Sequence, residues 1–242
     1  MIPGPGIGAP VELAYVADVE RYYERVRDLP WPVWLDSGHP ASNAGRFDII
    51  CADPFERIIV PGSAPSGLAE TGLAETGKSA FADIRRALGR RVAAPGGLPF
   101  AGGVVGFLGY DLLRSGFGLP ERPGLAGWPL AALGVYDWSI IVDHEQQRAW
   151  CVRAGRDPRG GQSWQQVLDC LTSIDPGTAC NEPVEDTFDA AVVAEMSKTD
   201  YAVAFDCIQR YIRDGDCYQV NFAQRFQARL SSDPWALYRA MR

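Results

Sequence analysis

An alternation of apolar and polar residues near the end of the chain restricts the possible folds more than any other feature. Between residues 218 and 230, apolar residues occupy almost all even positions and polar residues almost all odd positions. A repeat of two is typical of a β-strand, so this stretch predicts a long strand with one face on a core. The polar face carries Gln219, Asn221 and Arg225, whose side chains suit recognition of carboxylates and hydroxyls. We expect these three residues to line a ligand cavity; the alternative is a face that is merely solvated.

A helix is expected immediately before this strand. Apolar residues recur at helical spacing between residues 200 and 213, which predicts an amphipathic helix. Ser197 or Thr199 can cap its start, and Gly215 stands where a left-handed C-terminal cap is expected. The helix therefore delivers the chain through a tight turn into the polar-faced strand.

Residues 215–226 read Gly-Asp-Cys-Tyr-Gln-Val-Asn-Phe-Ala-Gln-Arg-Phe. This run resembles the signature that opens the chorismate-binding domain in the aminodeoxychorismate synthase component I family, which is related to anthranilate synthase component I. Stretches that begin at Leu29, Pro99 and Tyr136 resemble the same family in the same order. The resemblance implies an anthranilate synthase component I-like, α+β fold, with a large, mainly antiparallel sheet or sandwich flanked by helices.

The order of predicted elements agrees with that fold class. Short strands before any long helix favour an antiparallel sheet; they are expected at 31–38, 46–52, 57–60, 133–144 and 148–153. Glycines among apolar residues at 99–113 predict a buried strand that bends or lets another backbone approach. Residues 173–199 are polar, acidic and rich in turn formers, which is typical of a linker. We therefore expect one domain at 1–185, followed at 186–242 by the linker and the start of the catalytic domain.

The resemblance also implies a tryptophan-binding pocket in the first domain. Carried over position by position, the residues that would face the amino acid are Ser37, Ala44, Gly45, Arg46 and Phe47. The structural alternative is that Ser37 is a strand-end hydroxyl and that Arg46 pairs with Asp48.

The function that the resemblance implies is amination of chorismate to 4-amino-4-deoxychorismate, for para-aminobenzoate and folate synthesis. In that family Mg²⁺ assists the reaction, and a glutamine amidotransferase subunit (component II) supplies the ammonia. The family's lysine motif, metal-binding glutamates and active-site histidine lie downstream of the opening strand. We therefore expect these 242 residues to be the inactive N-terminal part of a longer enzyme, with no catalytic residue or metal ligand of their own. Anthranilate synthase component I and a tryptophan-binding regulatory module remain the alternatives.

A remote alternative is a nucleotide-binding enzyme, because Gly72–Ser79 matches the phosphate-loop pattern G-x-x-x-x-G-K-[ST]. A phosphate loop follows a strand directly, whereas the nearest predicted strand here ends at Val60. Residues 67–71 and 72–76 are also a tandem copy, which is typical of a tolerated duplication in a surface loop. We favour a chance match.

Composition excludes several other classes. A net charge of −7 argues against nucleic-acid binding, and no apolar run or leader segment indicates a membrane span or secretion. The six cysteines form no C-x-x-C pair, and His39 and His144 are the two histidines, so no zinc-site pattern can be written. We expect free thiols in a cytoplasmic protein, and we expect His144 to be a surface turn residue.

Overall fold

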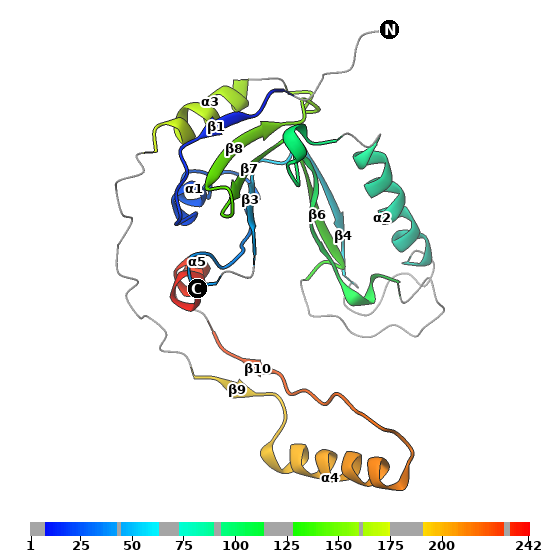
Figure 1. Cartoon of the computed structure of the whole chain (residues 1–242). Helices are drawn as coiled ribbons and strands as arrows, with labels where there is room; N and C mark the ends of the chain where they lie inside the picture. Colours follow the sequence, from blue (N-terminus) through cyan, green and yellow to red (C-terminus); the bar gives the residue numbers. More distant parts are fainter. Residues whose placement is uncertain are drawn as a thin grey trace. The chain divides into compact units, whose positions relative to one another are not determined.

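The computed structural model of the chain, drawn in Figure 1, describes residues 8–42, 45–62, 73–89, 93–113, 128–159, 162–174, 191–229 and 233–242. The chain divides into two compact units, Met1–Cys180 and Asn181–Arg242. The predicted boundary between residues 185 and 186 lies outside the described residues and stays a prediction.

Two antiparallel sheets form the framework of the first unit. A five-stranded sheet has the order β1-β8-β7-β3-β2, and a three-stranded sheet has the order β4-β6-β5. The strands are β1 (Val11–Leu13), β2 (Val33–Leu35), β3 (Phe47–Cys51), β4 (Glu56–Val60), β5 (Gly103–Leu108), β6 (Ala131–Tyr136), β7 (Trp138–Asp143) and β8 (Arg148–Arg153). Together with the flanking helices they confirm the predicted α+β class with mainly antiparallel sheets.

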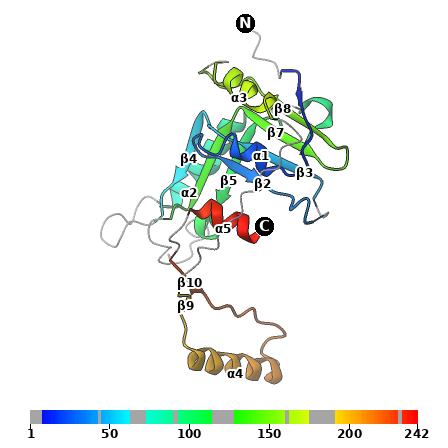
Figure 2. The same ribbon diagram turned by 90° about the vertical axis from the view of Figure 1, so that its left-hand side faces the viewer.

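Helices cover each sheet on one side, as Figures 1 and 2 show. Helices α1 (Glu20–Glu24) and α3 (Gln162–Thr172) cover one face of the five-stranded sheet, where Tyr22, Ile50, Ile140 and Leu171 form part of the main core. Helix α2 (Leu73–Leu88) packs against the three-stranded sheet through Ile84 and Ala87. Two short 3₁₀ helices, η1 (Pro95–Gly97) and η2 (Tyr110–Leu113), flank β5.

Strand alternation gives the five-stranded sheet a second packed face. Phe47, Ile141 and Trp150 point away from α1 and α3, and they pack against Phe100 in the segment that leads into β5. β3 and β7 are therefore covered on both sides, so side chains on either face of these strands are held firmly.

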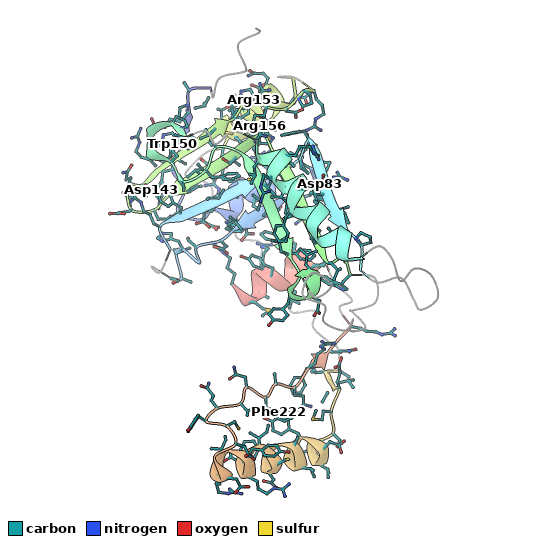
Figure 3. The ribbon with its side chains drawn as sticks, turned by 90° about the vertical axis from the view of Figure 1, so that its right-hand side faces the viewer. Asp83, Asp143, Trp150, Arg153, Arg156 and Phe222 are labelled. Carbon is teal, nitrogen blue, oxygen red and sulfur yellow. The ribbon has the colours of Figure 1, made fainter. Side chains whose placement is uncertain are left out.

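The predicted strand 133–144 is in fact two strands in different sheets, so that prediction is wrong in this respect. Asp137 separates β6 from β7. Its backbone carbonyl accepts a hydrogen bond from the Ala154 N–H at 2.7 Å, and its carboxylate accepts one from Arg153 Nε at 2.7 Å and another from the Arg156 N–H. These bonds fix the point at which the chain passes from the three-stranded sheet to the five-stranded one; Figure 3 labels both arginines.

The glycine-rich strand β5 partly agrees with its prediction. A Cβ added to Gly106 would lie 2.1 Å from the carbonyl oxygen of Ala132 in β6, which confirms that another backbone approaches closely. The prediction that the whole strand is buried is wrong, because β5 is an edge strand and Phe107 and Leu108 at its end are exposed.

The second unit contains β9 (Val193–Ala194), α4 (Lys198–Asp214), β10 (Phe226–Gln227) and α5 (Pro234–Met241). Helix α4 confirms the predicted helix and both of its caps. The Ser197 side chain accepts a hydrogen bond from the Asp200 N–H, and Gly215 adopts the left-handed conformation at φ 83°. No residue of α4 is buried.

The predicted long strand after α4 is wrong except at β10. Phe226 and Gln227 pair with β9, while residues 217–225 follow a non-regular path. A strand needs a hydrogen-bonding neighbour along its length, and the described part of this unit offers only the two residues of β9. The expected burial of the apolar face is also wrong: Tyr218 is 95% exposed, and Phe222 rests on Tyr201 of α4 with the ring centroids 4.8 Å apart (Figure 3).

Candidate functional site

A dense polar cluster surrounds the carboxylate of Asp48 in β3. Asp48 and Ile50 point to the helix-covered face of the sheet, and Asp48 is completely buried. The Trp34 Nε1–H donates to Asp48 Oδ1 at 2.8 Å, and the backbone N–H of Ser37 donates to the same oxygen at 2.9 Å. The Ser37 hydroxyl donates to Oδ2 at 2.8 Å. A buried carboxylate is thereby satisfied by donors from the end of β2.

His144 completes this cluster from the end of β7. Its Nε2 lies 2.5 Å from Asp48 Oδ2, its side chain is only 4% exposed, and its Nδ1 lies 3.1 Å from the hydroxyl of Tyr15. The ring of His39 stacks on it with centroids 3.9 Å apart. The prediction that His144 is a surface turn residue is therefore wrong, because β7 runs antiparallel beside β3 and brings His144 to a carboxylate far away in sequence.

Arg46 makes an ion pair with Asp143 rather than with Asp48. Its Nη2 lies 2.7 Å from Asp143 Oδ2, and its Nη1 lies 3.1 Å from Glu145 Oε2. Burial alone would raise the pKa of the Asp143 carboxyl. Hydrogen bonds from Arg46 and from the backbone N–H groups of Gln146 and Glu145 outweigh burial, so the pKa lies below its usual value. Figure 3 labels Asp143 at the edge of the first unit.

The described residues of the expected tryptophan pocket lie close together. A Cβ added to Gly45 would come within 2.6 Å of the Ser37 Cβ, so the two backbones touch and only glycine fits. The carbonyl of Arg46 accepts a hydrogen bond from the His144 N–H at 2.9 Å. The guanidinium of Arg46 lies over the ring of Phe47 at 4.7 Å. Ser37 and Gly45 thus form one wall, which Arg46 and Phe47 continue.

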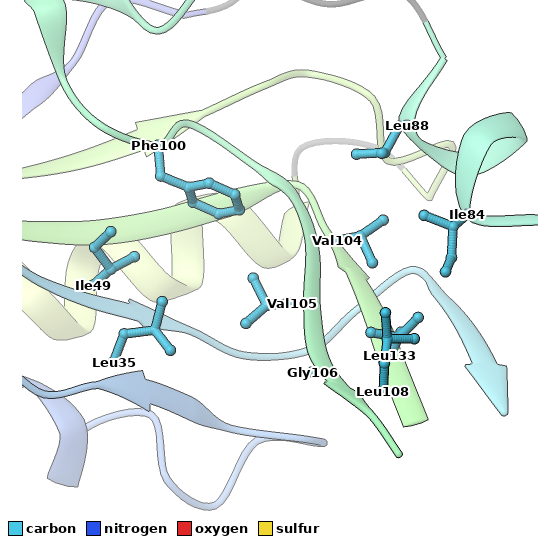
Figure 4. A pocket seen from close by; sticks show the side chains of 10 residues that line it. All are labelled: Leu35, Ile49, Ile84, Leu88, Phe100, Val104, Val105, Gly106, Leu108 and Leu133. Carbon is cyan, nitrogen blue, oxygen red and sulfur yellow. The ribbon is translucent and has the colours of Figure 1, made fainter. Parts of the chain in front are cut away.

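The first unit also contains an apolar pocket of about 470 Å³ (Figure 4). It lies between the two sheets and α2, and its lining includes Leu35, Ile49, Ile84, Phe100, Val105 and Leu133. Leu35 lies two residues before Ser37 in the chain and Ile49 two residues after Phe47, but the lining includes none of the four wall residues. Cavities of this size and polarity commonly take small aromatic ligands.

Other expected site residues lie elsewhere. Gln219, Asn221 and Arg225 are exposed in the second unit, where Arg225 Nη1 lies 3.4 Å from Glu195 Oε1. Their role in lining a cavity stays a prediction. Ala44 lies outside the described residues.

The structure contradicts the phosphate-loop alternative. Helix α2 begins at Leu73, so Gly77, Lys78 and Ser79 lie inside it. Their backbone N–H groups therefore serve the helix and cannot cradle a phosphate.

Two further findings concern the described residues as a whole. They contain no group of three His, Cys, Asp or Glu side chains arranged to hold a metal ion. None of the helices in this part of the chain combines the length and apolar character needed to cross a membrane.

Sequence reasoning missed Asp48, Trp34 and Tyr15 as members of the polar cluster. One signal was present: Asp48 is a carboxylate at an inward position of the otherwise apolar strand β3. A buried carboxylate needs several donors, and a search for them among neighbouring strand ends would have pointed to this cluster.

Known proteins match this chain over most of its length. A family model described as chorismate binding enzyme matches residues 33–242. Aminodeoxychorismate synthase component 1 of Klebsiella aerogenes is 34% identical over 228 residues, which cover 92% of this chain and 48% of that protein. Anthranilate synthase component 1 of Thermus thermophilus is 34% identical over 171 residues, which cover 66% of this chain and 36% of that protein.

A solved structure has the same fold. Anthranilate synthase component I from Streptococcus pneumoniae TIGR4 superimposes with a TM-score of 0.59 at 20% identity, covering 86% of this chain and 48% of that one. The chain spans about half the length of the curated relatives that it matches.

Proposed function

The chain belongs to the chorismate-binding enzyme family, and on that premise we propose that it is the N-terminal part of an enzyme that aminates chorismate to 4-amino-4-deoxychorismate. One observation carries the choice of product. Aminodeoxychorismate synthase component 1 combines 34% identity with coverage of 92% of this chain, whereas the Thermus thermophilus anthranilate synthase reaches that identity over 66% and a rice anthranilate synthase covers 86% at 25% identity. Anthranilate synthesis is the alternative product within the same family.

The reacting groups of the whole enzyme belong, in this proposal, to the part of the protein outside these 242 residues. Amination of chorismate calls for carboxylates that hold Mg²⁺ against the substrate and for a lysine or another acid–base group. The two lysines here are Lys78, inside α2, and Lys198, the first residue of α4. Among the described residues, no cluster of carboxylates that could hold Mg²⁺ stands beside Lys198. The proposed partner is a glutamine amidotransferase subunit that delivers ammonia. The proposed location of the enzyme is the cytoplasm.

The first unit has a second proposed role, which is to bind tryptophan. Two observations favour it: the expected residues Ser37, Gly45, Arg46 and Phe47 lie close together, and the first unit contains an apolar pocket whose lining includes Leu35 and Ile49, each two residues from a wall residue in the chain. The indole ring would enter the apolar pocket. Because the guanidinium of Arg46 is already paired with Asp143, the amino acid's polar groups would meet mainly backbone groups of the wall.

An activity assay tests the proposal that the catalytic groups lie outside these 242 residues. The 242-residue chain and the whole protein are each incubated with chorismate, Mg²⁺ and an ammonium salt, and the products are identified by chromatography and mass spectrometry. We expect 4-amino-4-deoxychorismate from the whole protein and none from the 242-residue chain. Product from the chain alone would contradict that proposal, and anthranilate from the whole protein would favour the alternative.

A further inference from the structure

We infer that Asp48 and His144 are positioning residues for the proposed tryptophan site, which they hold in shape by fixing Ser37 on one side and Arg46 on the other. The inference rests on the proposed function of that site. Neither side chain needs to touch the amino acid, because both act through residues of the wall.

Asp48 holds Ser37 at two points. The Ser37 backbone N–H binds one carboxylate oxygen at 2.9 Å, and its hydroxyl binds the other at 2.8 Å. Two bonds from one rigid group fix both the backbone and the side-chain rotamer of Ser37. Asp48 itself cannot shift easily, because it is fully buried in β3, between β7 and β2.

His144 connects the two sides of the wall. Its Nε2 lies 2.5 Å from the Asp48 oxygen that also accepts the Ser37 hydroxyl, and its backbone N–H donates to the Arg46 carbonyl at 2.9 Å. The same ring stacks on His39, whose backbone N–H lies 3.3 Å from Ser37 Oγ. Loss of the imidazole would therefore loosen Ser37 through both Asp48 and His39.

Tyr15 sets the orientation of the imidazole. Its hydroxyl lies 3.1 Å from Nδ1, so in the neutral ring Tyr15 donates to Nδ1 while Nε2–H donates to Asp48. Burial raises the pKa of the Tyr15 phenol, and the nearby negative charges of Asp143 and Asp48 raise it further. Its hydroxyl therefore keeps its proton and can donate at neutral pH.

A purely structural role for this network is the competing account, and Asp137 provides the matched control. Asp137 is also a buried carboxylate of the first unit, between β6 and β7, bound by Arg153 and by the Arg156 N–H. It has no contact with Ser37 or Arg46. If buried carboxylates here only stabilise the fold, Asp48→Asn and Asp137→Asn should have the same consequences.

The test uses the 242-residue chain and four variants, Asp48→Asn, His144→Phe, His144→Gln and Asp137→Asn. Hydrogen exchange of the Ser37 amide is followed by NMR, and tryptophan affinity is measured by calorimetry. We expect His144→Phe and Asp48→Asn to speed Ser37 exchange and weaken tryptophan binding by about tenfold or more, since each removes a buried hydrogen bond. His144→Gln, which keeps an N–H donor, should restore most of both quantities, and Asp137→Asn should change neither.

Three results would overturn the inference: unchanged Ser37 exchange in His144→Phe, no rescue by His144→Gln, or equal effects of Asp137→Asn and Asp48→Asn. If Asp48→Asn does not fold, the two His144 variants and Asp137→Asn still distinguish a positioning role from a purely structural one. If the unaltered chain binds no tryptophan while Ser37 protection still depends on His144, the positioning of Ser37 stands and the proposed tryptophan site fails.

Discussion

The two units use the same kinds of amphipathic segment with different results. In the first unit every residue of β7 is buried, because β3 and β8 flank the strand and side chains cover both of its faces. In the second unit α4 has a clear apolar stripe and a cap at each end, yet Phe205 and Tyr211 on that stripe are 46% and 50% exposed. Local sequence is sufficient to form the helix, whereas burial requires a partner layer.

This difference explains how the chain relates to the proposed enzyme. The first unit carries its own core. The second unit presents apolar side chains on α4 and on the segment after it, without a described layer over them. Under the proposed function, that layer is the remainder of the chorismate-binding domain.

The largest expected effect comes from removing a core side chain in the first unit. Ile140 is completely buried in the main core, so Ile140→Ala should lower the free energy of unfolding by about 2–5 kcal/mol. Phe205→Ala on α4 should cost less than about 1 kcal/mol, because that ring is half exposed. Urea unfolding followed by tryptophan fluorescence and circular dichroism measures both, and similar losses would remove the contrast between the units.

A smaller contrast is expected between a buried and an exposed ion pair. Arg153→Ala leaves Asp137, whose side chain is 4% exposed, without its guanidinium partner. The cost should be about 2–3 kcal/mol, at or below the low end for buried pairs because Arg153 is partly exposed. Arg225→Ala breaks an exposed contact with Glu195 and should cost at most about 1 kcal/mol. Urea unfolding measures both losses in the free energy of unfolding, and equal losses for the two variants would contradict the burial argument.

The smallest expected effect is a shift in acid sensitivity of the first unit. The pKa of Asp143 lies below its usual value, so its contribution to stability is complete above the unfolded-state pKa and is lost as the pH falls through the folded-state value. Arg46→Met should raise the pKa of Asp143, because burial then acts without the guanidinium. The variant should therefore be less stable at neutral pH, and it should lose less stability than the unaltered chain as the pH falls. A carboxyl ¹³C NMR titration measures the shift; an unchanged Asp143 titration would show that Arg46 is not the cause.

What the sequence predicted correctly was local or repetitive. The caps at Ser197 and Gly215 depend on residues within a turn of them, and the strands β2, β3, β4 and β8 follow from short apolar runs with turn formers between them. The family signatures identified the α+β class, which individual elements would have left open.

What the sequence did not show depends on distant partners. His144 is buried because antiparallel pairing brings it to Asp48, and Arg46 pairs with Asp143 because Phe47 stands opposite Asp143 in the register. The pattern at 218–230 has the strand repeat, but a repeat cannot supply the neighbouring strand that it needs. The division of 133–144 into two strands could not be predicted for the same reason. The hydrogen bonds that hold Asp137 come from distant residues, Arg153 at the end of β8 and Arg156 beyond it.

Native-state hydrogen exchange of the 242-residue chain tests the contrast between the units most directly. We predict that amides in β3, β7 and β8 exchange only through global unfolding of the first unit, and that amides of α4 and of residues 217–225 exchange at least roughly a hundredfold faster. Amides of α4 as slow as those of β7 would mean that the second unit carries a core of its own, and would contradict the account.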